Sequence, residues 1–138
     1  MAKGARRQTW IYPSSLFSPE DILHFVEEDD FGSDWKDLGL NDEDDLSALQ
    51  VMIMANPRGA PIVRGTGGLR KMRFAPDSWN SGKSGAARVC YAYFEKHWTV
   101  LLLMAYGKGA KENLSNSECL AIKKYLKTVE KYLDSRNY

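Results

Sequence analysis

The chain has 138 residues, 43% of them hydrophobic, which fits one globular domain with a buried core. Its two cysteines, Cys90 and Cys119, match no metal-binding or redox spacing, and the longest apolar run, VLLLMAY, is too short to span a bilayer. These features exclude a membrane-spanning helix and a disulfide-rich fold. The N-terminus is basic but lacks an apolar stretch, so we expect no signal peptide and a cytoplasmic protein with free thiols.

Charge is distributed unevenly along the chain, although the formal net charge is only +1. Residues 18–45 contain twelve Asp or Glu and one Lys, a net of −11, whereas residues 58–111 contain ten Lys or Arg and two acids, a net of +8. The basic residues are interleaved with strand-forming residues rather than placed on the polar face of a helix. This separation indicates a basic surface that binds phosphate.

The first half of the chain contains one clear helix. Residues 9–17, TWIYPSSLF, predict an extra strand or an ordered arm, and residues 18–23, SPEDIL, a capped helical turn. Residues 24–31, HFVEEDDF, predict a strand. Residues 41–57 predict a helix, because Asn41 is a suitable N-cap, acids fill the first turn and apolar residues recur on one face until a proline ends it.

The second half of the chain predicts a meander of strands followed by a helix. Residues 61–76 predict a strand that is entered through glycines, and residues 88–94 and 98–106 predict a hairpin. The last of these strands is apolar on both faces, so we expect it to be central in the sheet. Residues 115–133 predict a helix, whose SNSE start has the spacing of a capping box.

The segment SWNSGKSGAARV contains Gly-Lys-Ser, which resembles part of a phosphate-binding loop. The full pattern needs a glycine five residues before Gly82, where this chain has Asp77, and the residues that follow predict a strand rather than a helix. We therefore interpret the segment as a polar, mobile loop between two strands. In that interpretation Lys83 is an exposed cation that contacts phosphate.

Basic residues recur on the predicted strands and at their ends. Along LRKMRF, side chains alternate, so Lys71 and Arg73 share one face, while Met72 and Phe74 face a helix. Arg88 opens the next strand. The predicted catalytic patch consists of Lys71, Arg73, Arg88 and Lys108. Further predicted contacts to RNA or the ribosome are Arg70, Lys83, Tyr91, Tyr93 and Lys111.

The patch contains cations and tyrosines but no set of residues typical of a hydrolase. The chain has only two histidines, and it shows no catalytic triad spacing and no cluster of metal ligands, so we expect neither a metal nor a cofactor. Such a site suits RNA, because the 2′-hydroxyl of RNA is itself a nucleophile. Cations stabilise the charge that develops on the phosphorus centre, and a lysine and a tyrosine can transfer protons.

Four sequence blocks give the chain a family resemblance. They occur in this order: an Asn-Pro after a helix, GTGGLRKMRF, GKSGAARVCYAYF and AYGKGAKENLS. It resembles the RelE superfamily of bacterial toxins, and within it the HigB-type branch, over about residues 25–130. The resemblance implies an α+β fold with a small antiparallel sheet and helices packed on one side. It also implies a toxin domain at residues 23–138, preceded by an N-terminal extension at residues 1–22.

The same resemblance implies a metal-independent mRNA endonuclease that works on the ribosome, held inactive by a cognate antitoxin, often a helix-turn-helix protein. Lys71, Arg73 and Arg88 match the basic active-site residues of these toxins, and Lys108 matches in approximate position. One position departs from the pattern: RelE has a catalytic tyrosine in its C-terminal segment, where this chain reads KENLS. Either Tyr91, Tyr93 or another group replaces it, or the cations act alone.

Two alternatives remain open at this point. A ParE-like toxin shares the fold and inhibits DNA gyrase by binding, but such a protein needs no nuclease surface. A catalytically inactive module of the same fold would bind nucleic acid or a partner without cutting, and the missing C-terminal tyrosine favours that alternative.

Overall fold

The computed structural model describes residues 22–76, 79, 85–107, 109–110 and 113–136, together with the backbone of residues 6–7. The predicted arm at residues 9–17 lies outside the described residues, as does most of the predicted helical turn at residues 18–23. Among the described helices, none combines the length and the apolar character that a bilayer span requires.

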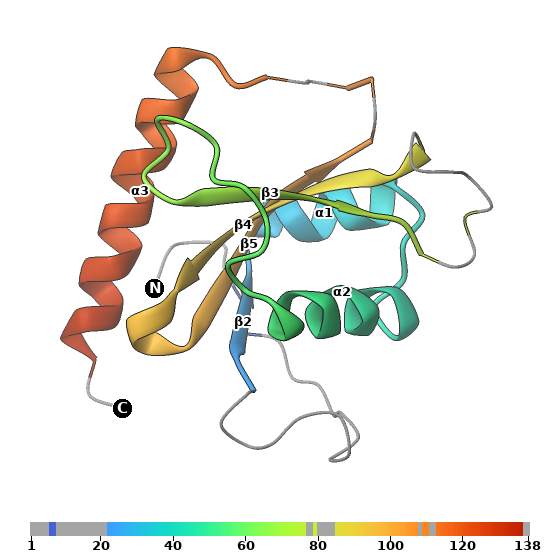
Figure 1. Cartoon of the computed structure of the whole chain (residues 1–138), viewed down its shortest axis with the longest axis horizontal. Helices are drawn as coiled ribbons and strands as arrows, with labels where there is room; N and C mark the ends of the chain where they lie inside the picture. The colour runs from blue at the N-terminus through green and yellow to red at the C-terminus, as the bar shows by residue number, and fades with distance from the viewer. Residues whose placement is uncertain are drawn as a thin grey trace.

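A five-stranded, mostly antiparallel sheet forms the centre of the molecule (Figure 1), in the order β1-β2-β5-β4-β3. β3, β4 and β5 are an antiparallel meander, β2 pairs in parallel with β5, and β1 pairs antiparallel with β2. β5 is central, as predicted, and the hairpin turn over EKH is a short 3-10 helix, η3. The elements are β1 (Arg6–Arg7), β2 (His24–Glu27), β3 (Leu69–Phe74), β4 (Ala87–Phe94), η3 (Glu95–His97) and β5 (Thr99–Tyr106).

Two short helices, α1 (Asp29–Asp37) and α2 (Asp44–Ala55), cover one face of the sheet. The sequence HFVEEDDF predicted a strand through residue 31, but the strand ends at Glu27. Asp29 and Asp30 instead begin α1, where their charge favours the first turn, and Phe31 and Trp35 bury one face of it.

The helix predicted at residues 41–57 is present as α2, but it begins at Asp44 with Glu43, not Asn41, at the N-cap position. Its entry is fixed by Asn41, whose side-chain oxygen accepts hydrogen bonds from the backbone N–H of Asp44 (2.7 Å) and Asp45 (3.1 Å). Leu46, Leu49 and Ile53 are buried on the predicted face. The helix ends at Ala55, two residues before the proline.

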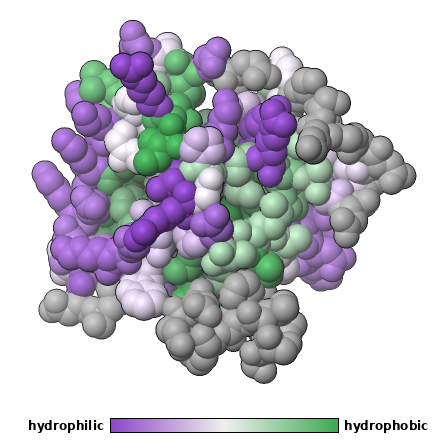
Figure 2. All heavy atoms as spheres, viewed as in Figure 1, coloured by the Kyte–Doolittle hydropathy of each residue, from purple (hydrophilic) through white to green (hydrophobic). Residues whose placement is uncertain are grey.

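The third helix, α3 (Asn116–Ser135), begins at the predicted capping box of Ser115 and Glu118. The α+β class with a small, mostly antiparallel sheet is confirmed, but α3 lies on the face opposite α1 and α2 rather than beside them. Its residues Leu126 and Val129 pack against Leu69 and Leu101 of the sheet. The reason is that β4 and β5 are apolar on both faces, so both faces need cover. Figure 2 shows hydrophilic side chains along the outer side of α3.

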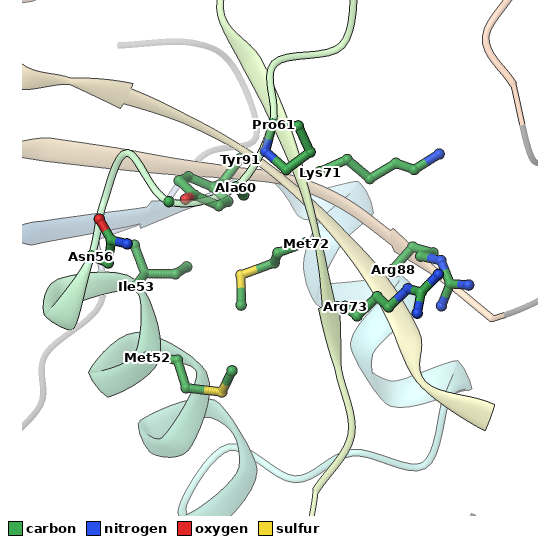
Figure 3. Close-up of a pocket in the computed structure, with 11 residues that line it drawn as sticks. Met52, Ile53, Asn56, Ala60, Pro61, Lys71, Met72, Arg73, Arg88 and Tyr91 are labelled. Atoms are coloured by element: carbon green, nitrogen blue, oxygen red, sulfur yellow. The ribbon is translucent and has the colours of Figure 1, made fainter. Parts of the chain in front are cut away.

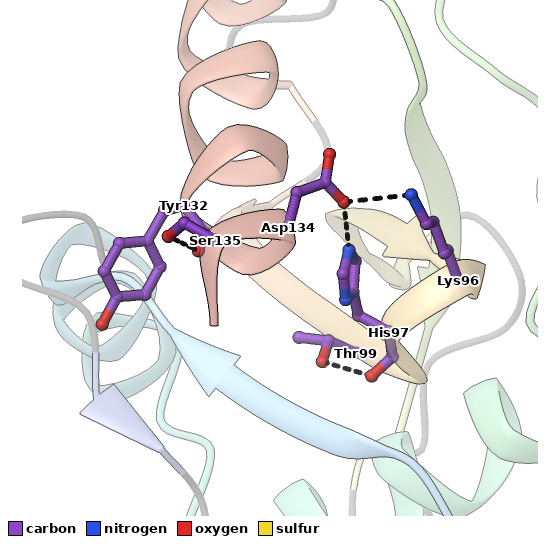
Figure 4. A network of polar contacts seen from close by, with 6 residues as sticks. All are labelled: Lys96, His97, Thr99, Tyr132, Asp134 and Ser135. Atoms are coloured by element: carbon purple, nitrogen blue, oxygen red, sulfur yellow. Dashed lines mark hydrogen bonds and ion pairs between the residues drawn. The ribbon is translucent and has the colours of Figure 1, made fainter. Parts of the chain in front are cut away.

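The end of α3 is tied to the β4–β5 hairpin by polar contacts (Figure 4). His97 Nε2 lies 2.7 Å from Asp134 Oδ1, and Lys96 Nζ lies 3.4 Å from the same oxygen. The hydrogen bond with His97 holds the pKa of the Asp134 carboxyl below its ordinary value. His97 therefore has a structural role, which is to hold the β4–β5 turn to α3. This turn lies at the opposite end of β4 from Arg88.

Candidate functional site

Three of the predicted cations lie together on the α3 face of the sheet, beyond the part that α3 covers. Leu69 faces α3, so the alternating Lys71 and Arg73 of β3 face the same way. Arg73 is directly opposite Arg88 of β4, and Arg88 is directly opposite Tyr106 of β5. The strand register therefore places two guanidinium groups and a phenol in one row across the sheet.

A cleft of about 660 Å³ lies along this part of β3 (Figure 3). The side chains of Lys71, Arg73 and Arg88 extend to one side of β3, and Met72 extends toward α2 on the other. The apolar wall includes Met52 and Ile53 of α2. The cleft thus has a cationic side and an apolar side, separated by the edge strand of the sheet.

Among the described residues, no acid balances the positive charge of the two arginines. Arg88 is only 8% exposed and donates a hydrogen bond from Nη1 to the carbonyl oxygen of Ala86 (2.8 Å). Among the described residues, neither Arg73 nor Arg88 forms an ion pair with a carboxylate. Two close cations without a counterion in the described part of the chain favour binding of an anion, and guanidinium groups suit phosphate in particular.

Tyr106 belongs to this site, although the sequence interpretation did not select it. Lys71 Nζ lies 6.0 Å from the centroid of the Tyr106 ring, within the range of a cation–π contact. Burial raises the pKa of the neighbouring Cys90 thiol to about 11, which disfavours the reactive thiolate near neutral pH. The sequence feature that could have identified Tyr106 is its position as the last residue of an apolar strand, directly before a basic, glycine-containing segment.

The two tyrosines that were predicted as stacking surfaces do not stand in the cationic row. Tyr91 is 1% exposed, its hydroxyl donates to the carbonyl oxygen of Pro57 (2.8 Å), and burial raises its pKa. It lines the apolar side of the cleft, since it belongs to the core under α1 and α2. Tyr93 packs against the same core and is half-buried. The alternation of β4 places both tyrosines on the face opposite the cationic row, because odd positions from Val89 to Tyr93 face that core.

The remaining predicted residues have other positions or lie outside the described residues. Arg70 faces the α2 side and donates hydrogen bonds to the carbonyl oxygens of Arg58 (2.9 Å) and Ala60 (2.7 Å), so it fastens the segment after α2 to β3. Three predicted site residues lie outside the part of the chain that the structure describes: Lys83, Lys108 and Lys111. Within the described part of the chain, no group of three or more His, Cys, Asp or Glu side chains is arranged to hold a metal ion.

No known family model matches the sequence of this chain.

Proposed function

We propose that the chain is a RelE-like, HigB-type toxin that cuts mRNA on the ribosome without a metal ion. The observation that supports this proposal most strongly is the row of Arg73, Arg88 and Tyr106, with Lys71 beside it, on one face of the sheet. This set can bind a phosphodiester and stabilise a doubly charged phosphorane, and it also contains two groups that exchange protons.

The reaction uses the nucleophile that RNA carries. The 2′-oxygen attacks the adjacent phosphorus while Lys71, in its neutral amine form, accepts the 2′-hydroxyl proton. The bond from phosphorus to the 5′-oxygen breaks, and Tyr106 donates a proton to the departing oxygen. Arg73 and Arg88 neutralise the non-bridging oxygens, which gain charge in the transition state. The products are a 2′,3′-cyclic phosphate and a 5′-hydroxyl end, and no water is consumed in this step.

Ribosome dependence follows from what this site lacks. Of the residues that the structure describes, neither a histidine nor a carboxylate lines the cationic cleft, so these residues offer no strong general base for the 2′-hydroxyl. In-line attack requires the 2′-oxygen, phosphorus and 5′-oxygen to be aligned, and free single-stranded RNA adopts this geometry rarely. A messenger held in the decoding site supplies the alignment, and orientation of this kind contributes much of the rate in intramolecular reactions.

The partners of the proposed function are the ribosome, mRNA and a cognate antitoxin, for which the family resemblance suggests a helix-turn-helix protein. An antitoxin that covers the cationic row would block access of the phosphodiester. A small helix-turn-helix reading frame beside this one would support the assignment, and co-purification of the two products would test it directly.

The decisive experiment maps RNA ends after the protein is induced in cells and after it is added to translating ribosomes. We expect new 5′-hydroxyl ends at fixed positions within codons, 2′,3′-cyclic phosphates on the matching fragments and little cutting of naked RNA. The same mapping with Arg73→Ala should show no cuts. Intact mRNA together with trapped gyrase–DNA complexes would favour a ParE-like toxin, and RNA binding without cutting would favour an inactive module.

A further inference from the structure

A second cavity, of about 220 Å³, lies next to the cationic row on the α3 face of the sheet. It shares Lys71 and Tyr106 with the row, so the two sites are continuous. Apolar side chains form most of its wall: Val63, Met104, Ala105, Ala110 and Leu114. The polar groups that reach it are few, which is typical of a site that orients a flat, mostly apolar ligand.

The acid at this cavity, Asp34, comes from the opposite side of the sheet. β2 pairs with β5 only as far as Leu102, so the edge of β5 beyond that residue is not paired with a strand. Asp34 of α1 fills this gap, because its Oδ2 accepts a hydrogen bond from the backbone N–H of Ala105 (3.0 Å). Its other oxygen, Oδ1, has no hydrogen-bond partner among the described residues. A fixed carboxylate with one oxygen available therefore borders an apolar cavity.

The size of the cavity suits one aromatic heterocycle. A cavity of roughly 150 Å³ in a protein core accommodates a benzene molecule, and this one is larger by about half. The Tyr106 ring offers a flat surface, and stacking of a base on an aromatic side chain tolerates any base. The carboxylate does discriminate, because an ionised Asp only accepts hydrogen bonds and so pairs with an amino group of a base, as with N4 of cytosine.

Lys71 lies where the two sites meet. It lines both the cleft with the arginines and the smaller cavity. A nucleotide whose phosphate lies against Arg73 and Arg88 therefore has its base within reach of the cavity beside Tyr106. Burial raises the pKa of Asp34, with like-charged neighbours adding to the effect, which indicates a partly dehydrated carboxylate. A hydrogen bond to such a group is stronger than one in water.

We infer that this cavity binds the base of a nucleotide next to the scissile phosphate, and that Asp34 selects bases that carry an exocyclic amino group over uracil. The inference rests on the proposed nuclease function for its context. It assigns Asp34 to specificity rather than to the chemical step, because Asp34 lines the smaller cavity and not the cleft that contains the arginines.

The test compares the wild-type protein with Asp34→Asn. Asparagine keeps an oxygen that accepts a hydrogen bond from the N–H of Ala105, and it turns an amino donor toward the cavity. It should therefore donate a hydrogen bond to a carbonyl oxygen of uracil, where the aspartate accepts one from an amino group. Translating ribosomes are programmed with messages that carry each of the four bases at each position around the cut. We expect the wild type to cut messages with uracil at one position about tenfold more slowly or worse, the scale of one hydrogen bond to a charged group. Asp34→Asn should remove or reverse that preference and cut its best message within a few-fold of the wild-type rate.

The matched control is Asp37→Asn, on the same helix but exposed and outside the cavity, which should keep the wild-type base profile. A second measurement does not need cleavage: binding of the 5′-monophosphates of cytidine, adenosine, guanosine and uridine, followed by NMR. Weaker binding of uridine monophosphate, relieved by Asp34→Asn, would support the cavity assignment even if the protein cut no RNA. Cleavage with the same base profile in the wild type and Asp34→Asn would overturn it and leave the nuclease proposal standing.

Discussion

Replacing Arg73 with glutamine should make the protein more stable and abolish its activity. Arg73 is exposed and lies directly opposite Arg88 in the antiparallel pair of β3 and β4, where like charges repel. Such cross-strand pairs contribute about 0.2–1 kcal/mol, and like charges directly opposite are destabilising. We therefore expect Arg73→Gln to raise the free energy of unfolding by about 0.2–1 kcal/mol at low salt. The gain should shrink in 1 M salt, where the screening length falls to about 3 Å.

In the proposed reaction, the same substitution removes a hydrogen-bond donor to the developing phosphorane charge. Losing one such donor in other enzymes lowers the catalytic rate about 10²–10³-fold, so single-turnover cleavage on programmed ribosomes should fall by that factor. The matched control is Arg58→Gln, because Arg58 is also exposed but pairs with Glu95 of the β4–β5 turn. It should lower stability slightly, by at most about 1 kcal/mol, and leave cleavage unchanged.

Urea unfolding followed by tryptophan fluorescence, in low and in high salt, measures the stability change. A loss of more than about 1 kcal/mol in Arg73→Gln would show that Arg73 holds the fold together and would refute the argument from repulsion. Wild-type cleavage by a folded Arg73→Gln protein would show that the cationic row is not the active site.

Three further predictions concern stability. Phe74→Ala should lower the free energy of unfolding by about 3–5 kcal/mol, and Met72→Ala by clearly less in the same urea titration, since Phe74 is fully buried and Met72 only half-buried. Trp98→Gly should be more stable to heat than Trp98→Ala by about 1 kcal/mol, because residue 98 has φ of 54° and glycine tolerates that conformation; equal stability would contradict a strained backbone. Tyr125→Phe should be less stable than the wild type below pH 10, and the difference should shrink above pH 10. Burial and the hydrogen bond to Glu28 raise the pKa of Tyr125 above its ordinary value of 10.0, so the stability it contributes is complete below that pH and is lost as the pH rises; a constant difference across this range in pH-dependent unfolding would contradict it.

The sequence was most informative where structure depends on neighbouring residues. The hairpin of β4 and β5 follows from β-branched and aromatic residues around a short turn, and α3 follows from a capping box and an apolar stripe. Both patterns lie within about twenty residues, so the competing conformations are few. The face on which Lys71 and Arg73 lie was also predictable, because the alternation of a strand is fixed once Phe74 is assigned to the core.

Local reading was misleading where an acidic run allowed two interpretations. HFVEEDDF has β-forming residues at its start and acids that suit the first turn of a helix at its end. The structure uses both, with β2 ending at Glu27 and α1 beginning at Asp29. The position of α3 was implied by the apolar residues on both faces of β5, but the expected arrangement placed the helices on one side. Burial of Leu101 under α3 and of Leu102 under α1 and α2 shows that both faces are covered.

The parts of the site that sequence reasoning did not find depend on contacts between distant segments. Tyr106 lies next to Lys71 only because β4 and β5 pair in a register with an extra residue, Leu103, opposite the step from Cys90 to Tyr91. That bulge shifts the end of β5 by one position and turns Tyr106 toward the α3 face. No pattern in the sequence marks such a bulge in a run of apolar residues.

The separation of charge along the chain corresponds to a separation between the two faces of the sheet. The acidic residues of α1 and the start of α2 lie on one side, and the row containing Arg73 and Arg88 opens on the other. An apolar sheet between them keeps the acids from neutralising the cations, so the row retains its attraction for phosphate. Asp34 reaches around the unpaired end of β5, and its carboxylate stops at the cavity beside Tyr106 rather than at the arginines. A single acid placed there can distinguish one base from another without weakening the binding of the phosphate.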